Sequence, residues 1–153
     1  MKKILVLCVL ISVGLVSAAQ ARVLLSSETT CTGTDVTVTT TDEKVIATQV
    51  VPMPQGQTFL MRIRFWGTMT TSANSTTYTL KVRRDSLSGT ALGDSIAETV
   101  KVTAGSVEAF FFEFTDERNG QFAALTYVST IDMAGADANT TVSQNCITVD
   151  VLQ

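Results

Sequence analysis

The feature that most constrains this chain is a regular alternation of apolar and polar residues between Thr58 and Asp85. Every second position is apolar in two runs, which contain Phe59, Met61, Ile63 and Phe65, and then Tyr78, Leu80 and Val82. Successive side chains of a β-strand point to opposite faces, so a period of two predicts two strands that each bury one face. The small polar segment between them, Thr71 to Ser75, is typical of a turn.

We expect these two strands to pair as an antiparallel hairpin. The register that places Phe65 opposite Leu80 or Val82 keeps all the apolar side chains on one face. A slip by one residue would mix the two faces, and the first register is therefore favoured.

In that register the other face of the hairpin gathers a basic cluster. It contains Arg62, Arg64, Lys81 and Arg83, with Trp66 beside them. Such a cluster is a candidate surface for an anionic glycan or for an acidic patch on a neighbouring subunit, with Trp66 as the anchor. The alternative is a solvated sheet face, on which like charges in neighbouring strands cost a little stability.

Alternation and turn residues predict further strands along the rest of the chain. They cover residues 34–41, 44–53, 94–103, 107–115, 122–133 and 142–152, with residues 23–25 as a candidate edge strand. No segment beyond the N-terminal region shows a helical period. About eight strands with turns at regular spacing predict an all-β sandwich or barrel. The length allows one domain, which we place at residues 22–153.

Residues 1–21 have the three parts of a secretory signal peptide. Lys2 and Lys3 supply the charge, residues 4–16 are apolar, and Ala19 and Ala21 are the small residues that a signal peptidase recognises. Cleavage after Ala21 would leave Arg22 at the N-terminus. The alternative is an uncleaved anchor, for example in the membrane of a lipid-containing virion. Both predict an exported protein or a virion-surface protein.

Two of the three cysteines follow the signal. Cys31 stands near the start of the predicted domain and Cys146 in its last strand, while Cys8 belongs to the signal. Exported chains with two cysteines usually bond them, and the terminal strands of many β-sandwiches are neighbours. We therefore expect a Cys31–Cys146 disulfide; the alternative is two separate buried thiols.

Composition excludes several classes of protein. Hydrophobic residues make up 45% of the chain and charged residues 16%, which argues against disorder. Without Lys2 and Lys3, nine basic residues face fourteen acidic ones, a net charge of −5, so no nucleic-acid binding is expected. The chain has no histidine, which rules out histidine-dependent triads and histidine-ligated metals. We predict no enzyme activity and no cofactor.

Three weaker patterns are interpreted conservatively. A carboxylate pair for glycoside hydrolysis would have to come from Glu113, Asp116 and Glu117; a charged turn after the strand is favoured. A calcium site would use Asp132, Asp137 and Asn139, which lack the spacing of a known loop. Asn74 and Asn139 begin formal glycosylation sequons in predicted loops.

The order of segments from Lys44 to Val149 resembles a known family. The segments are residues 50–52 (VVP), 59–68 (FLMRIRFWGT), a Ser/Asn loop, 78–84 (YTLKVRR), 102–105 (VTAG), 114–116 (FTD), 125–127 (LTY) and 147–149 (ITV). This order resembles the tumour-necrosis-factor-like jelly-roll structural proteins of phages and environmental viruses. The resemblance implies an eight-stranded antiparallel jelly-roll β-sandwich, often trimeric, that serves in decoration, fibres or attachment. A signal peptide is a departure from such virion proteins, and it also fits a bacterial surface protein.

Two functions follow, both without catalysis. The first is a structural jelly-roll subunit of a virion or cell-surface assembly; the second is a secreted adhesin or carbohydrate-binding module of a bacterial surface. Phe111 lies on the opposite face of its strand from Phe110, Phe112 and Phe114, and a sandwich has only one interior. An aromatic left on an outer face typically marks an interface. We therefore expect self-association through Phe111 and Trp66, with a homotrimer implied by the resemblance.

Overall fold

The computed structural model describes residues 22–39, 43–72, 76–92, 98–120, 123–134 and 140–153. This part of the chain forms nine strands and no helix. The strands are β1 (Leu24–Thr32), β2 (Val36–Val38), β3 (Lys44–Pro52), β4 (Thr58–Thr71), β5 (Thr76–Arg84), β6 (Glu98–Val102), β7 (Val107–Asn119), β8 (Ala124–Ala134) and β9 (Thr140–Leu152). The all-β prediction is confirmed. The predicted N-terminal signal or hydrophobic helix lies outside the described residues, and among those described no helix could span a membrane.

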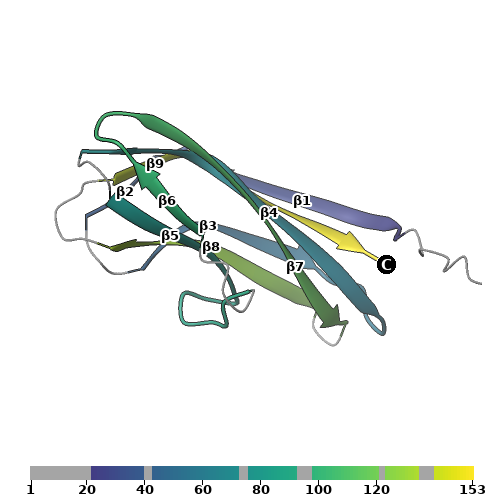
Figure 1. Ribbon diagram of the computed structural model, residues 1–153. Coiled ribbons are helices and arrows are strands. Elements are labelled where there is room, and N and C mark those ends of the chain that lie inside the picture. Colours follow the sequence, from purple (N-terminus) through teal and green to yellow (C-terminus); the bar gives the residue numbers. More distant parts are fainter. Residues whose placement is uncertain (1–21, 40–42, 73–75, 93–97, 121–122, 135–139) are drawn as a thin grey trace, which may run out of the picture.

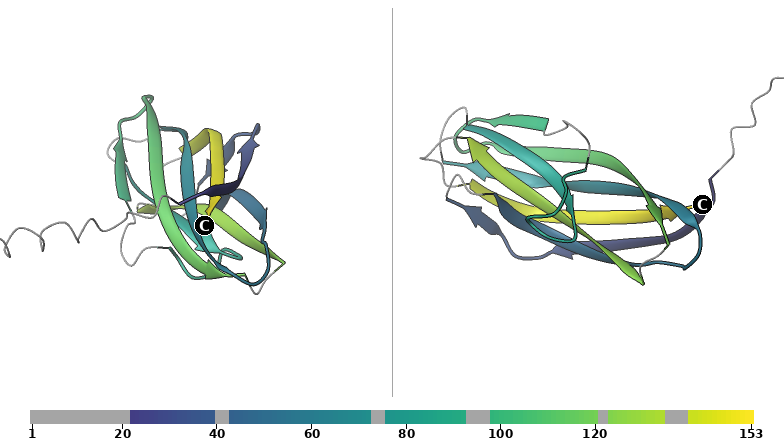
Figure 2. Two further views of the ribbon diagram at one scale, coloured as in Figure 1. Left: turned by 90° about the vertical axis from the view of Figure 1, so that its right-hand side faces the viewer. Right: turned by 90° about the horizontal axis from the view of Figure 1, so that it is seen from below.

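The strands form two antiparallel sheets that face one another across one core (Figure 1). The first sheet has the order β1-β9-β4-β7, and β2 also pairs with β9; the second has the order β3-β8-β5-β6. β1 and β2 lie end to end along β9 and together occupy one strand position, so the nine strands fill eight positions, four in each sheet. From β2 onward successive strands alternate between the two sheets, except that β5 and β6 are neighbours in the second, and this is the order of a jelly roll. Figure 2 shows the two sheets from the end and from below, with β1 at the margin of the molecule.

The predicted central hairpin is wrong. β4 pairs with β7 and β9, whereas β5 pairs with β6 and β8 in the other sheet. Phe65 therefore lies opposite Phe112 and Ile147, not opposite Leu80 or Val82. The apolar side chains of β4 and β5 can share one core either as neighbours in one sheet or as strands of two opposing sheets. Alternation alone does not distinguish these two arrangements.

The predicted faces of the strands are nevertheless correct. In β4 each odd-numbered residue from Phe59 to Thr71 is buried, and in β7 the inward residues include Phe110, Phe112 and Phe114. Tyr78, Leu80 and Val82 of β5 face them from the second sheet and are also fully buried. The core is thus made by alternate residues of both sheets, as in other sandwiches.

Three strand boundaries differ from the sequence-based prediction. The candidate edge strand at residues 23–25 extends over all of β1, and the strand predicted at residues 34–41 is reduced to the three residues of β2. The turn predicted at residues 116–120 is strand as far as Asn119, because the buried Asp116 pairs with Arg84 and need not reach solvent. Charge along a strand is therefore a weak turn signal when another strand supplies the counter-ion.

Candidate functional site

The predicted surface residues of β4 and β7 meet on the outer face of the first sheet, which is turned away from the core. Three neighbouring rows of side chains cross this face from β1 to β7. The rows are Ser27, Asp150, Arg62 and Thr115; then Thr29, Thr148, Arg64 and Glu113; then Cys31, Cys146, Trp66 and Phe111. The outer face thus changes along the strands from charged to apolar.

Asp150 holds the two arginines of β4. Its carboxylate accepts hydrogen bonds from Arg62 Nε and Nη2 at 3.0 and 2.7 Å, and from Arg64 Nη2 at 2.9 and 3.1 Å. Ser27 Oγ donates a further bond at 2.6 Å. The side chain of Asp150 is only 2% exposed, against 40% for Arg62 and 34% for Arg64. The two arginine side chains therefore cover Asp150 and remain themselves partly exposed.

The electrostatics of this group follow from its contacts. Burial by itself raises the pKa of Asp150, but hydrogen bonds from Ser27 and Arg62 and the charges of Arg64 and Arg62 hold that pKa below its ordinary value. Asp150 is therefore ionised at neutral pH. With Glu113 opposite Arg64, two positive and two negative side chains share these rows, which then carry no net charge.

An apolar strip adjoins the charged rows. It consists of Trp66 on β4 and of Val107, Ala109 and Phe111, three successive outward positions of β7. Phe111 is 61% exposed and Val107 67% exposed, and Trp66, directly opposite Phe111, is half-buried. Leaving such side chains on a flat sheet face is unfavourable in water, so the apolar strip is the part of this face best suited to contact another surface.

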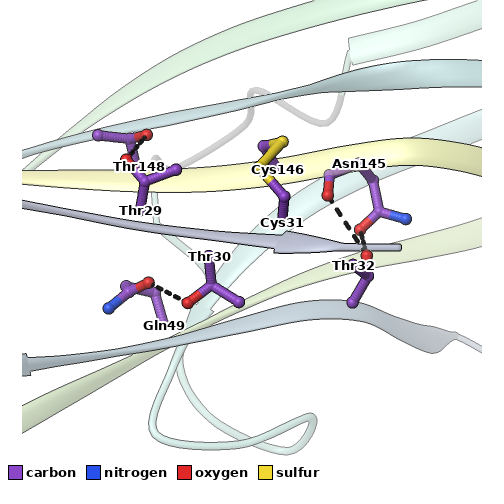
Figure 3. Close-up of a disulfide and its surroundings, with 8 residues drawn as sticks. All are labelled: Thr29, Thr30, Cys31, Thr32, Gln49, Asn145, Cys146 and Thr148. Atoms are coloured by element: carbon purple, nitrogen blue, oxygen red, sulfur yellow. Dashed lines mark hydrogen bonds between the residues drawn. A yellow bond between two sulfur atoms is a disulfide. The ribbon is translucent and has the colours of Figure 1, made fainter. Parts of the chain in front are cut away.

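The predicted disulfide closes the same row at its other end. Cys31 and Cys146 lie directly opposite one another on β1 and β9 and are bonded, with their Cα atoms 4.1 Å apart (Figure 3). Cys146 in turn lies opposite Trp66. The bond joins residues 115 positions apart in the sequence and ties the first strand to the last.

Lys81 and Arg83 do not join the basic cluster that was predicted. They lie on β5, in the second sheet, because β4 and β5 do not form a hairpin. Arg83 donates to both carboxylate oxygens of Glu43, each at 2.6 Å, and Lys81 Nζ lies 3.5 Å from Glu43 Oε2. Thr130 also donates to Glu43. This pair of basic residues is therefore part of an ion-pair group on the other side of the sandwich.

The candidate carboxylates are not arranged for glycoside hydrolysis. Asp116 points into the sandwich and is 3% exposed, whereas Glu113 and Glu117 point outward. Glu113 and Glu117 are four residues apart on one strand, about 13 Å, which exceeds the separation that either hydrolytic mechanism uses. Asp116 instead accepts hydrogen bonds from Arg84 and from Tyr127, both in the second sheet. Burial, and then the Asp116 charge, raise the pKa of the Tyr127 hydroxyl.

The remaining candidates give no site in the part of the chain that the structure describes. Asp137, Asn139 and Asn74 lie outside it, and Asp132 Oδ2 is 3.7 Å from Lys81 Nζ. No three acidic or cysteine side chains among the described residues are grouped to hold a metal ion.

Sequence reasoning missed Asp150 and part of the apolar strip. Asp150 stands at an outward position of β9, but its arginine partners can be recognised only once β9 is known to pair with β4. Val107 and Ala109 share the outward parity of Phe111, and this signal was present in the sequence.

Comparison with known proteins identifies the fold but no family. No family model and no curated protein sequence matches the chain. A chain of T=1 particles derived from infectious bursal virus matches with a TM-score of 0.56 and 11% identity, over 82% of this chain and 31% of that one. A chain of the Gt strain of infectious bursal disease virus gives 0.54 and 9%, over 86% and 33%. A chain from a study of disulfide-linked pili, the Bacillus endospore appendages, gives 0.42 and 19%, over 84% and 88%.

The viral matches show a shared fold. This chain spans about a third of the length of those viral chains. The fold of the described residues is thus one that also occurs within longer viral chains.

Proposed function

We propose that this protein is an exported, non-catalytic structural subunit of a cell-surface or virion assembly, and that its copies associate through the apolar strip. The observation that carries the proposal is the exposure of Phe111, next to Trp66, on the outer face of a sheet whose inner face already fills the core. A disulfide agrees with export, because such bonds persist in oxidising compartments.

Energetics favour contact between copies at this strip. Burying one large aromatic side chain that is otherwise in water contributes about 2–3 kcal/mol per subunit. The adjoining charged rows are neutral, while residues 22–153 carry a net charge of −5. Two copies can therefore approach through this face with less like-charge repulsion than elsewhere.

The number of copies is part of the proposal. In the jelly-roll family that the sequence resembles, the outer face of one sheet meets its copies around a threefold axis. A homotrimer built in this way would place Phe111 and Trp66 of each subunit near the axis. The fold supports such a role, since the infectious bursal virus chain that shares it comes from T=1 particles.

The test is the mass of the assembly in solution for single variants of the mature chain. Phe111→Asp should convert the assembly to folded monomers, and Trp66→Asp should weaken it, as measured by light scattering after gel filtration. The matched control is Val50→Asp, since Val50 is 53% exposed on β3 of the other sheet. Circular dichroism checks that each variant is folded. A wild-type protein that stays monomeric at high concentration would refute the proposal, as would a Phe111→Asp variant that assembles unchanged.

A second candidate function uses the same face. Trp66, the single tryptophan of the chain, lies beside the partly exposed side chains of Arg62 and Arg64, and together they offer an aromatic ring and hydrogen-bond donors to an anionic polysaccharide even though Asp150 balances part of the arginine charge. This surface would make the protein an adhesin or carbohydrate-binding module. Titration with heparin, followed by Trp66 fluorescence, should show saturable binding that Arg62→Ala weakens; no change in emission would exclude it.

A further inference from the structure

The edge strand β1 is attached to the sandwich but contributes nothing to its core. None of its nine residues is buried, and none belongs to the apolar core cluster. Its backbone pairs with β9, and pairing extends from Leu24 to Thr32. In contrast β2, which continues along the same strand, places Val38 in the core with no exposure. β2 is thus anchored in the core through Val38, whereas β1 lies at the edge of the sheet without a buried side chain.

Polar contacts hold β1 in place besides the backbone ladder. Thr29 and Thr148 share a hydrogen bond of 2.7 Å, and Thr30 donates to Gln49 Oε1 at 2.5 Å (Figure 3). Each of these groups can bond equally well to water, so each bond adds little to stability. The Cys31–Cys146 bond is therefore the strongest constraint that keeps β1 on β9.

The segment between β1 and β2 is suited to act as a hinge. It comprises Gly33, Thr34 and Asp35, all exposed. A Cβ atom at Gly33 would have no atom of a non-neighbouring residue within 4 Å, so that side of the chain is open at this point. A short exposed connection that separates an anchored strand from an unburied one lets the latter leave β9 without disturbing the core.

If β1 left, the edge of β9 that it now covers would be open to a new strand. The inward side chains of β9, among them Ile147 and Val149, would stay packed in the core, and its other edge would stay paired with β4. The edge exposed by β1 would have unpaired backbone groups along residues 145–152. The segment that fits this edge, with its Cys31 opposite Cys146 and its Ser27 beside Asp150, is β1 itself, from the same copy or from another.

We propose that β1 is an exchangeable arm, locked by the Cys31–Cys146 disulfide, and that a thiol allows β1 of one copy to replace β1 on the β9 edge of a second copy. The exchange recreates every contact of β1 between two chains, which is the general reason that swapping an element is inexpensive. This contact is independent of the apolar strip and adds a second way in which copies of the chain join.

The chemistry is thiol–disulfide exchange without net oxidation. Cys31 is exposed and Cys146 is nearly buried, so the thiolate of a small thiol such as glutathione attacks Cys31 Sγ and Cys146 leaves as a thiolate. The arm, now carrying the mixed disulfide at Cys31, moves to a second copy. That second copy has been opened in the same way by another glutathione thiolate, and its own Cys31 also carries a mixed disulfide. Its Cys146 thiolate attacks Cys31 Sγ of the incoming arm and releases one glutathione thiolate, which leaves one interchain disulfide.

An isotope-mixing experiment tests the proposal. Equal amounts of ¹⁵N-labelled and unlabelled mature protein are mixed without denaturant, with substoichiometric reduced glutathione and without oxygen. After the thiols are blocked, digestion and mass spectrometry measure the Cys31–Cys146 linked peptide. We expect peptides with one heavy and one light half to appear with glutathione and to be absent without it. Absence of mixed peptides in both samples would overturn the proposal.

A second measurement separates arm exchange from a chance surface bond. In a Cys31→Ser, Cys146→Ser double variant, the amides of β1 and of the facing β9 edge should lose hydrogen-exchange protection, while those of β4 and β7 keep it. Equal protection of β1 in the variant and the oxidised wild type would contradict the proposal. If the variant fails to fold, the isotope experiment alone decides.

The two proposed contacts can be distinguished by repeating the isotope mixing with Phe111→Asp protein. Mixed peptides should form in that variant as well, because its apolar strip is not involved in arm exchange. Loss of mixed peptides in Phe111→Asp alone would show that exchange requires the strip, and would overturn the independence of the two contacts.

Discussion

At the scale of single residues, buried or half-buried acids and close approaches specify how the strands fit. Asp150, Glu43 and Asp116 each meet an arginine from a strand distant in the sequence. Such pairs contribute to stability mainly by avoiding an unpaired charge, since removing one partner leaves the other without a counter-ion in a poorly solvated position. Gly67 is a different case, because the neighbouring chain leaves no room for a Cβ atom at this position.

Gly67→Ala should destabilise the protein. A Cβ at this position would lie 2.7 Å from the Phe110 ring and 3.0 Å from the Cα of Asn145, where β9 bulges next to β4. We expect a loss of about 1–3 kcal/mol in the free energy of unfolding, as for other overpacked sites. Urea denaturation measures it. Gly33→Ala, at a position with open space, is the control and should change the value by less than the error.

Glu43→Gln should reduce stability at neutral pH but not in acid. Burial opposes ionisation of Glu43, yet hydrogen bonds from Arg83 and Thr130 and the charge of Lys81 lower its pKa from 4.5 to about 2. The folded-state pKa lies below the unfolded one, so this contribution is complete above about pH 5 and is lost as pH falls towards 2.

The measurement is the unfolding free energy of wild type and Glu43→Gln at about pH 7, 5 and 3. We expect a difference of roughly 1–3 kcal/mol at neutral pH, which shrinks at the lowest pH. Glu113→Gln, at an exposed position of β7, serves as the control. A difference that stays constant with pH would contradict the assignment of the effect to the Glu43 charge.

At the scale of elements, side-chain bonds between the sheets supplement the apolar core. Asp116 of β7 accepts from Arg84 Nε at 3.0 Å and from the Tyr127 hydroxyl at 2.9 Å, and these donors lie at the end of β5 and on β8. One carboxylate therefore ties a strand of the first sheet to two strands of the second. Asp116 can occupy an inward position of β7 only because Arg84 pairs with its carboxylate.

Asp116→Ala should cost about 3 kcal/mol of unfolding free energy, since it leaves Arg84 and Tyr127 without their shared acceptor. The matched control is Glu113→Ala, three residues earlier on the outward face of the same strand, for which we expect a change near zero. Chemical denaturation of both variants gives the comparison. Equal losses in the two variants would show that the bond between the sheets is not the cause.

At the scale of the whole molecule, one covalent bond closes the jelly roll. Because Cys31 and Cys146 are separated by 115 positions, their bond restricts the unfolded chain over nearly the whole domain. Figure 1 shows the consequence, with the first and last strands side by side in one sheet. The same bond that fixes the arm β1 thus limits the entropy gained on unfolding.

The double variant Cys31→Ser, Cys146→Ser should therefore be less stable than the oxidised wild type. The chain-entropy model gives about 4–5 kcal/mol for a loop of this size, as an upper value. Denaturation at low protein concentration, where copies stay separate, measures the loss. Unchanged stability would mean that the unfolded chain is already restricted without the bond.

The sequence by itself determined the existence of most strands, their inward faces and the pair of cysteines. Period-two alternation in β4, β5 and β7 depends only on the local chain, and Phe59, Tyr78 and Phe112 are buried as that alternation predicts. The cysteine pair followed from the count of cysteines behind a signal-like segment.

Only the tertiary structure decided which strands are neighbours. β4 and β5 belong to opposite sheets, so Arg62 and Arg64 meet Asp150 while Lys81 and Arg83 meet Glu43. The physical reason is that a strand's backbone can pair with any strand of matching length, and its apolar face is satisfied by any apolar partner. Pairing is therefore chosen by the whole set of strands at once, which no local pattern contains.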